Sequence, residues 1–357
     1  MWLKMNRLFL VAAMAAVLVI GLFAGRPALA ATYIAFDLTP SSFIQSRGDF
    51  ANGTQYVGSG TTDNKYWQPI LWNDNSGNYS ILGNDKGTII GPMRNCGSQQ
   101  VGFGSLWNGT ADSRVYLTTP NSFFSAVTGT NGTQQVGYLG PNYRATLWNG
   151  GPDKYIDLHP NGYWDSQALG ISGTQAFGYA SSQYPHAMIW NVNANTSIDL
   201  NPNEYDCSEI LGSNGIQQVG TSWNVNDLQS HAILWSGSKD NIIDLTPAGF
   251  TTCFANGING TQQVGDGHGP ATNNNEHALL WNGTVDGYID LHQFLPIDFS
   301  QSVANTIDAE GNIIGTAYYA SGQSRAILWV PVPEPSTLVL LGIGMIGLIG
   351  YTWRKRQ

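Results

Sequence analysis

Seven copies of one short pattern fill most of the chain, and they limit the possible folds more than any other feature. Each copy has a strand-like segment that ends in Gly, usually Val-Gly, followed by a Leu-Trp or Ile-Trp pair. The tryptophans of these pairs are Trp72, Trp107, Trp148, Trp190, Trp235, Trp281 and Trp329. They recur at intervals of roughly 35 to 50 residues, and a repeat of that length with several short strands indicates the blades of a β-propeller.

Four strands are predicted in each copy. Residues 168–172 illustrate the first strand, and the two-residue turn that follows it is Asn-Gly in several copies. Asn and Gly accept the positive φ angles of a type I′ turn, which joins antiparallel strands. A Gln-Gln-Val-Gly segment is the second strand, residues 231–235 exemplify the third, and an Ile-Asp-Leu segment such as residues 243–245 is the fourth.

The third strand indicates how the sheets pack. Alternation along residues 231–235 sends Ile233 and Trp235 to one face and Ala232 with Leu234 to the other. Both faces are apolar, so this strand must be covered on both sides. A blade that lies between two neighbouring blades meets this requirement.

The two ends of the repeat region together complete one unit. The last copy ends at Trp329 without a fourth strand, whereas residues 33–38 form a fourth strand with no blade before them. Pairing the two would close a ring and remove exposed sheet edges. We therefore predict an all-β fold over residues 31–331: a seven-bladed β-propeller of four-stranded blades, closed by the N-terminal strand. The second copy is degenerate, because residues 81–83 replace Ile-Asp-Leu and residues 101–107 leave room only for a tight hairpin.

Residues 1–30 have the features of a secretory signal peptide. Lys4 and Arg7 precede an apolar run at residues 8–24, and Ala28 and Ala30 form the small-x-small pattern of a cleavage site. We expect a signal helix that is removed after export. An uncleaved signal anchor is the alternative, because the apolar run is long for a signal peptide.

Residues 332–357 contain a second targeting pattern. Pro333, Glu334 and Pro335 lead into an apolar run at residues 337–353, which a basic cluster follows (Arg354, Lys355 and Arg356). The run is long enough for a transmembrane helix, and the positive-inside rule keeps the basic cluster cytoplasmic. These three parts, in this order, closely resemble the PEP-CTERM sorting signal. A plain tail anchor is the alternative.

The PEP-CTERM resemblance implies processing by an exosortase in a Gram-negative bacterium, the kind of cell that makes exopolysaccharide. It implies an inner-membrane anchor at the C-terminus before processing and a cut near Pro335. The processed protein would then belong to the cell envelope, the cell surface or the extracellular matrix.

The charge of the region between the two targeting segments argues against nucleic-acid binding. The whole chain has a net charge of −9, with 15 Lys and Arg against 24 Asp and Glu. Six of the basic residues lie in the terminal segments, but only one acidic residue does, so the repeat region is more acidic than the whole chain. Such a surface repels phosphate backbones.

The three cysteines, Cys96, Cys207 and Cys253, do not form a disulfide scaffold. Cys207 and Cys253 occupy nearly equivalent places in adjacent copies, so they could form a disulfide. The alternative is two buried thiols that behave as small apolar side chains.

Three of the third strands share a family resemblance. Residues 186–190, 231–235 and 277–281 begin with His-Ala, end in Trp and precede an Asp-Leu strand, as in the extracellular HAF repeat. The third residue of these strands departs from the HAF pattern, because it is Met, Ile or Leu instead of Phe. Arg144 and Arg325 replace the histidine in two copies. The resemblance implies a fold and an extracellular location, and the family carries no agreed activity.

The repeated histidines and aspartates are interpreted as scaffold. His186, His231 and His277 share one position in successive copies, and their spacing matches no zinc motif. The aspartate of the fourth strand also recurs once per copy, which suits a carboxylate that accepts backbone N–H bonds in a turn. We expect no metal, no cofactor and no catalytic residue.

The connection between the second and third strands varies most in length, and it is longest in the sixth copy, from Asp266 through Leu279. Variable insertions in repeat proteins gather on one face, which is often the binding face. Irregular aromatic residues occur on this face: Trp67, Tyr143, Trp164, Tyr184 and Trp223. They could stack on sugar rings, or they could simply pack the loops over an apolar surface.

Together these features predict an exported, non-catalytic surface or matrix protein that binds exopolysaccharide or surface proteins through its loops. The alternative is a secreted carbohydrate-active hydrolase or lyase that uses carboxylates on the same face. Clustered acidic residues with raised pKa values around the central channel would favour the alternative. A channel lined by Gly, Ser and Ala would argue against it.

Overall fold

The computed structural model describes residues 32–74, 76–83, 94–102, 104–118, 125–227 and 229–332. The chain divides into two units, one spanning Tyr33–Val330 and the other comprising Met1–Thr32 with Pro331–Gln357. The predicted signal peptide with Ala28 and Ala30, and the predicted sorting signal from Pro333 onward, lie outside the described residues. Among the described residues, no helix is long and apolar enough to cross a membrane.

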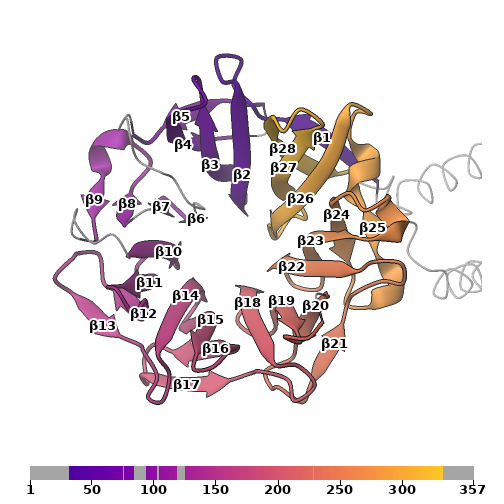
Figure 1. Cartoon of the computed structure of the whole chain (residues 1–357). Coiled ribbons are helices and arrows are strands. Elements are labelled where there is room, and N and C mark those ends of the chain that lie inside the picture. Colours follow the sequence, from indigo (N-terminus) through magenta and orange to yellow (C-terminus); the bar gives the residue numbers. More distant parts are fainter. Residues whose placement is uncertain are drawn as a thin grey trace, which may run out of the picture. The chain divides into compact units, whose positions relative to one another are not determined.

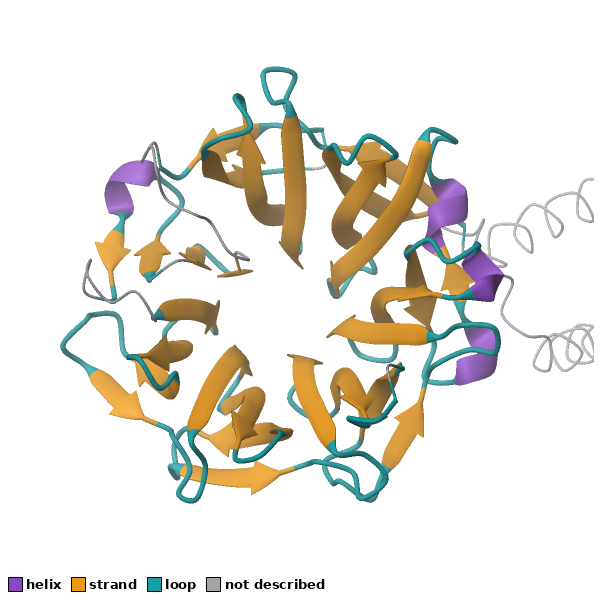
Figure 2. Ribbon diagram, viewed as in Figure 1, coloured by secondary structure: helices purple, strands orange, loops and turns teal. Residues whose placement is uncertain are grey.

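Within Tyr33–Val330, the described strands form seven four-stranded sheets arranged in a ring (Figure 1). In all seven described blades the first and second strands pair in an antiparallel manner. The first strand of each sheet lies innermost, and the fourth lies at the outer rim (Figure 2). The predicted seven-bladed, all-β propeller is therefore confirmed.

The strands of the first four blades are as follows. Blade 1 contains β2 (Gln45–Asn52), β3 (Gln55–Thr61), β4 (Trp67–Trp72) and β5 (Tyr79–Ile81). Blade 2 contains β6 (Arg94–Cys96), β7 (Gln99–Gly102), β8 (Ser105–Trp107) and β9 (Val115–Tyr116). Blade 3 contains β10 (Ala126–Thr130), β11 (Gln135–Leu139), β12 (Arg144–Trp148) and β13 (Tyr155–Asp157). Blade 4 contains β14 (Asp165–Ser172), β15 (Gln175–Ser181), β16 (Pro185–Asn191) and β17 (Thr196–Asp199).

The remaining blades follow the same order, with one exception in the last. Blade 5 contains β18 (Cys207–Ser213), β19 (Gln218–Trp223), β20 (Ser230–Trp235) and β21 (Ile242–Asp244). Blade 6 contains β22 (Thr252–Ile258), β23 (Gln263–His268), β24 (His277–Trp281) and β25 (Ile289–Asp290). Blade 7 contains β26 (Phe299–Ile307), β27 (Ile313–Tyr319), β28 (Ser324–Pro331) and, as its outer strand, β1 (Tyr33–Asp37). Short 3-10 turns are η1 (Ala111–Ser113), η2 (Pro270–Thr272), η3 (Val285–Gly287) and η4 (Leu291–Phe294).

The two ends of each blade carry different connections. One end carries the connections between the second and third strands and the links to the next blade, and we call it the loop face. The other end carries the tight turns between the first and second strands and between the third and fourth, and we call it the turn face. Blade 2 is the shortest, as the sequence predicted, and its four strands have only 3, 4, 3 and 2 residues.

The third strands are buried on both faces. Ile233 packs in a cluster with side chains of blade 4, such as Ile189, whereas Leu234 packs with side chains of blade 6, such as Trp281. The indole of Trp235 also donates a hydrogen bond to the Leu200 carbonyl of blade 4 at 3.0 Å. The alternation predicted from the sequence thus forms the core between blades.

A hydrogen-bond relay also joins neighbouring blades. The backbone N–H of Ala187 in blade 4 donates to Ser208 Oγ of blade 5 at 2.9 Å, and that hydroxyl donates to Asn201 Oδ1 at 2.6 Å. The same serine position accepts from the blade before it at three other junctions: Ser166, Ser302 and Ser46. Each relay satisfies a backbone donor that the blade interface removes from water.

A β-bulge in the innermost strand explains the repeated Val-Gly. The register shifts between Ile210 and Gly212, and Gly220 of the second strand faces this bulge. A Cβ atom on Gly220 would lie 1.9 Å from the Glu209 carbonyl oxygen, so no other residue fits. The same bulge occurs in five other blades, and it bends the strand that lines the channel.

Candidate functional site

The repeated histidines and aspartates pair with one another inside single blades. His186 Nδ1 lies 2.8 Å from Asp199 Oδ2, and the other oxygen of Asp199 accepts from the backbone N–H of Asn201 at 2.8 Å. The pairs of His231 with Asp244 and of His277 with Asp290 have the same geometry. Arg144 and Asp157 form the equivalent ion pair in blade 3. The aspartates thus accept the backbone N–H bonds that the sequence predicted, and each histidine pairs with the aspartate of its own blade.

The cysteines are all free. Cys207 and Cys253 are buried, and burial raises the pKa of both thiols, that of Cys207 to about 11. The structure thus has the second alternative, two buried thiols, and lacks the disulfide. Among the described residues, no group of three or more His, Cys, Asp or Glu side chains could hold a metal ion.

Three tyrosines cluster at the loop-face ends of blades 3 and 4. The rings of Tyr138 and Tyr143 lie 5.5 Å apart at an interplanar angle of 71°, and both are partly exposed. Tyr179 occupies in blade 4 the position that Tyr138 has in blade 3, directly after the glycine of the second strand. Burial, together with the nearby Glu209 and Asp165 carboxylates, raises the pKa of Tyr179. We call Tyr138, Tyr143 and Tyr179 the tyrosine cluster.

Glu209 lies beside this cluster on the innermost strand of blade 5, where it is only partly exposed. Burial raises the pKa of its carboxyl group to about 7. The folded protein therefore binds a proton at Glu209 over a pH range in which the unfolded chain has released it. Near neutral pH this side chain can both donate and accept hydrogen bonds.

Glu209→Gln tests this titration. The carboxyl pKa is higher in the folded state than the ordinary value of 4.5, so its ionisation destabilises the fold as pH rises from about 4.5 to about 7. We expect the variant to match the wild type at pH 4 and to exceed it in stability at pH 8, by up to about 3 kcal/mol. Denaturant unfolding at both pH values measures this difference, with the exposed Glu204→Gln as control. An equal effect at both pH values would contradict the prediction.

A second carboxylate site lies in blade 6. Asp266 is only 4% exposed and accepts a hydrogen bond from Asn256 Nδ2 at 2.7 Å. Burial and the Glu276 carboxyl group, which is hydrogen-bonded to it, raise the pKa of Asp266 well above its ordinary value. Asp266 therefore stays protonated to a higher pH than an exposed aspartate does. Asp266 belongs to β23, which continues to His268, so the loop predicted from Asp266 onward begins later than expected.

The five aromatic residues predicted for this face do not form one site. Ser166 N donates to the Tyr143 carbonyl at 2.7 Å, so the loop of Tyr143 lies against the segment that carries Trp164, which is 72% exposed. Tyr184 lies in the following loop of blade 4, and its hydroxyl accepts from a neighbouring glutamine at 3.2 Å. Trp67 in blade 1 is covered by the Arg47 guanidinium, 4.7 Å from the ring centroid, and Trp223 ends β19 in blade 5.

Tyr138, Tyr179, Glu209 and Asp266 are not among the site residues predicted from the sequence, although the sequence contains a signal for three of them. Three of them occupy the residue directly after the glycine of the second strand. Across the blades with a full second strand this position holds Ser59, Tyr138, Tyr179, Thr221, Asp266 and Thr316. A small hydroxyl residue is the common choice, so the two tyrosines and the aspartate stand out.

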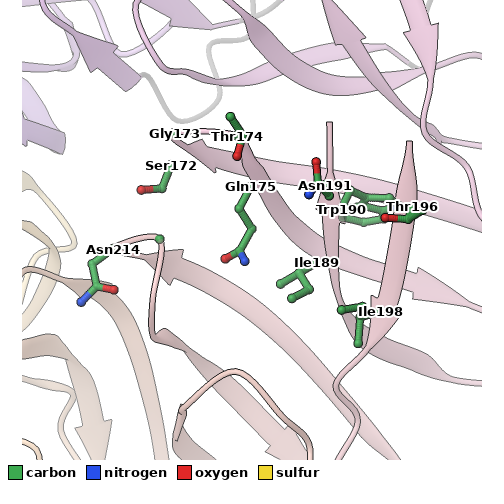
Figure 3. Close-up of a pocket in the computed structure, with 11 residues that line it drawn as sticks. Ser172, Gly173, Thr174, Gln175, Ile189, Trp190, Asn191, Thr196, Ile198 and Asn214 are labelled. Atoms are coloured by element: carbon green, nitrogen blue, oxygen red, sulfur yellow. The ribbon is translucent and has the colours of Figure 1, made fainter. Parts of the chain in front are cut away.

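The turn face has hollows of its own. The channel opens there through a cavity of about 770 Å³, and amide side chains link successive turns around it, as between Asn214 Nδ2 and the Asn259 carbonyl at 2.9 Å. A smaller cavity of about 70 Å³ lies deeper in the channel, and Arg94 and Phe50 line it. A separate groove of about 430 Å³ lies between blades 4 and 5, where Ile189 and Ile198 form an apolar floor (Figure 3).

Comparison with known families concerns the end of the chain. The family model of the PEP-CTERM protein-sorting motif matches residues 331–357. The chain carries a PEP-CTERM sorting motif. This motif implies an exported protein that is anchored at the cell envelope and processed by an exosortase. No curated protein matches the chain at a significant level.

Solved structures resemble the ring. An oligogalacturonate lyase from Vibrio parahaemolyticus superposes with a TM-score of 0.58 at 12% identity, over 86% of this chain and 98% of that one. An oligogalacturonate lyase in complex with manganese gives 0.54 at 11%, over 86% and 97%. A prolyl endopeptidase gives 0.55 at 11%, over 82% of this chain and 51% of that one. At these identities the likeness shows the propeller fold alone.

Proposed function

We propose that this protein is a surface-displayed propeller that binds a polysaccharide of the extracellular matrix through its loop face, without cleaving it. The observation that carries the proposal is the tyrosine cluster, which lies beside Glu209 and the exposed Trp164. Partly exposed aromatic rings next to hydrogen-bonding groups are the usual components of sugar sites, because rings stack on the apolar faces of sugars while polar groups bond the hydroxyls.

Charge narrows the ligand to a neutral or amino-sugar polysaccharide. Asp165, Glu276 and the ionised form of Glu209 lie toward this face, and their carboxylates would repel a polyanion. Both phenols are protonated at neutral pH, because burial raises the pKa of Tyr138 and of Tyr179 further above the ordinary tyrosine value of 10.0, so each can donate a hydrogen bond to a sugar hydroxyl.

The double substitution Tyr138→Ala with Tyr179→Ala tests the site. An aromatic contact contributes about 1 kcal/mol, so we expect polysaccharide affinity to fall roughly 10- to 30-fold in a titration of residues 32–332. Tyr155→Ala is the matched control, because this tyrosine is 56% exposed on an outer strand away from the cluster. If the double variant folds and binds the polysaccharide with unchanged affinity, the proposal is wrong.

A secreted hydrolase or lyase is the second candidate, and the carboxyl pair of Asp266 and Glu276 favours it. Glycosidases hold their two carboxyl groups about 5 to 10 Å apart, on either side of the bond they cleave. These two are hydrogen-bonded to each other and Asp266 is buried, which suits a structural pair better. The fold shared with oligogalacturonate lyase adds no activity to this chain. If the protein released reducing ends from a polysaccharide, and Asp266→Asn abolished that release, the enzyme would be favoured over the binding protein.

Three further assignments belong to the same proposal. We infer that exosortase cuts near Pro335, after the apolar C-terminal segment has held the protein in the inner membrane. The His-Ala strands are assigned to the HAF repeat type on their sequence resemblance. β1 is assigned the role of locking the ring, because it supplies the outer strand of blade 7.

A further inference from the structure

A basic side chain, that of Arg94, lines the inner cavity of the channel. Arg94, at the start of β6, lines the inner cavity of about 70 Å³, and its guanidinium lies 5.2 Å from the centroid of the Phe50 ring. One of its five N–H donors reaches across the channel to the Leu211 carbonyl of blade 5 at 3.3 Å. Among the described residues, Arg94 has no other hydrogen-bond acceptor.

The next residue adds an unpaired acceptor. Asn95 is 2% exposed and lines the outer cavity of about 770 Å³ at the turn face. Its Oδ1 has no hydrogen-bond partner among the described residues, and its Nδ2 makes only a long contact of 3.5 Å with the Gln55 carbonyl. A buried acceptor without a partner costs stability, and a ligand hydroxyl would remove that cost.

The two cavities form one path. They share lining residues, so a molecule that enters at the turn face meets first Asn95 and then Arg94. The shared residues are Phe50, Thr130, Ile171, Ser213, Ile258 and Ile307. The outer cavity is large enough for a monosaccharide or disaccharide, whereas the inner one has room only for a small group.

The charges along this path select for a single negative charge. Asp308 and Glu310 lie at the outer cavity, and Asp49 acts electrostatically on Arg94. A polyanion or a dianion would meet these carboxylates, whereas one carboxylate matched to the planar guanidinium gains a two-point hydrogen bond. Burial lowers the pKa of Arg94 to about 10, so the side chain stays charged at neutral pH.

We propose that the turn-face end of the channel binds a small hydroxyl-rich monocarboxylate, such as a sugar acid. Its carboxylate would bind Arg94, and a hydroxyl group would donate to Asn95 Oδ1. This site is distinct from the loop-face site, because the two lie at opposite ends of the blades. It adds a soluble ligand that the proposed polysaccharide function does not require.

Calorimetric titration of residues 32–332 with glucuronate tests the site, and glucose, acetate and inorganic phosphate serve as comparison ligands. We expect glucuronate to bind most tightly, acetate and phosphate weakly, and glucose not at all. Arg94→Met should weaken glucuronate binding at least tenfold, and Arg94→Lys should weaken it less because the charge remains. Arg114→Met in the same blade is the matched control and should bind as the wild type does.

Two outcomes would overturn the assignment. One is the absence of glucuronate binding to the wild-type protein at millimolar concentration, and the other is equal affinity in folded Arg94→Met. Asn95→Asp provides an independent variant, because a carboxylate at this position should repel glucuronate while leaving the guanidinium in place. Loss of polysaccharide binding at the loop face would leave these results unchanged, so the two proposals fail separately.

Discussion

A protein that lacks β1 (Tyr33–Asp37) is expected to lose about 5 kcal/mol of unfolding free energy and to melt on the order of 10 °C lower than residues 32–332. Deletion removes Tyr33, which is 3% exposed, and leaves β28 as an unpaired edge. It also cuts the chain beside Leu38, whose N–H bonds the Ala326 carbonyl at 2.9 Å and whose carbonyl accepts from the Trp72 indole at 2.8 Å. Thermal unfolding by circular dichroism measures the loss.

The outward side chains of the same strand provide the control. Ile34 and Phe36 are 52% and 38% exposed, so Ile34→Ser with Phe36→Ser keeps the strand and removes little buried surface. We expect this double variant to melt within a few degrees of the wild type. A melting temperature unaffected by deletion of β1 would show that the ring does not depend on its outer N-terminal strand.

Removal of residues 333–357 is expected to change the location of nearly all of the protein. The PEP-CTERM motif lies at residues 331–357, and we expect its apolar run at residues 337–353 to hold the chain in the inner membrane until processing. Without it, the propeller should leave the membrane fraction and collect in soluble fractions. Immunoblots of fractionated cells measure the distribution.

A smaller change separates sorting from folding. Replacing Arg354, Lys355 and Arg356 by alanine removes the cytoplasmic basic cluster but keeps the apolar run, so we expect unprocessed protein to accumulate. The propeller of either variant should melt as the wild type does, because β28 ends at Pro331. An unchanged envelope location in the 333–357 deletion would contradict the sorting role of the motif.

The fold could be predicted from the sequence because each blade repeats the same physical requirements. The Trp of the third strand fills the space between blades, and the glycine of the second strand clears the bulge opposite it, as Gly220 does. Where the Ile-Asp-Leu segment is missing, in blades 1 and 2, one requirement remained. Leu82 and Leu117 are buried like the leucines of the Ile-Asp-Leu segments. Each donates its backbone N–H to a carbonyl in or directly before the third strand of its own blade, as Leu158 does.

The candidate site could be predicted only in part, because irregular residues stand out in loops but not in the repeated strands. Tyr143 and Trp164 lie in loops and were predicted, whereas Tyr138 and Tyr179 lie at strand ends, where the repeated pattern makes them hard to distinguish. The raised pKa of Glu209 depends on how deeply neighbouring blades bury it, and no local pattern reports that depth. Arg94 was missed for a related reason, since the shortened blade 2 gives no register that places it in the channel.

One measurement tests the central claim most directly. Purified residues 32–332 are incubated with the neutral exopolysaccharide of the producing bacterium, and both the bound fraction and the length of the polysaccharide chains are then measured. Our account predicts that the polysaccharide is retained by the wild type, that retention falls in the Tyr138→Ala, Tyr179→Ala variant, and that chain length does not change. Polysaccharide that is shortened, or that is not retained at all, would contradict a non-catalytic binding propeller.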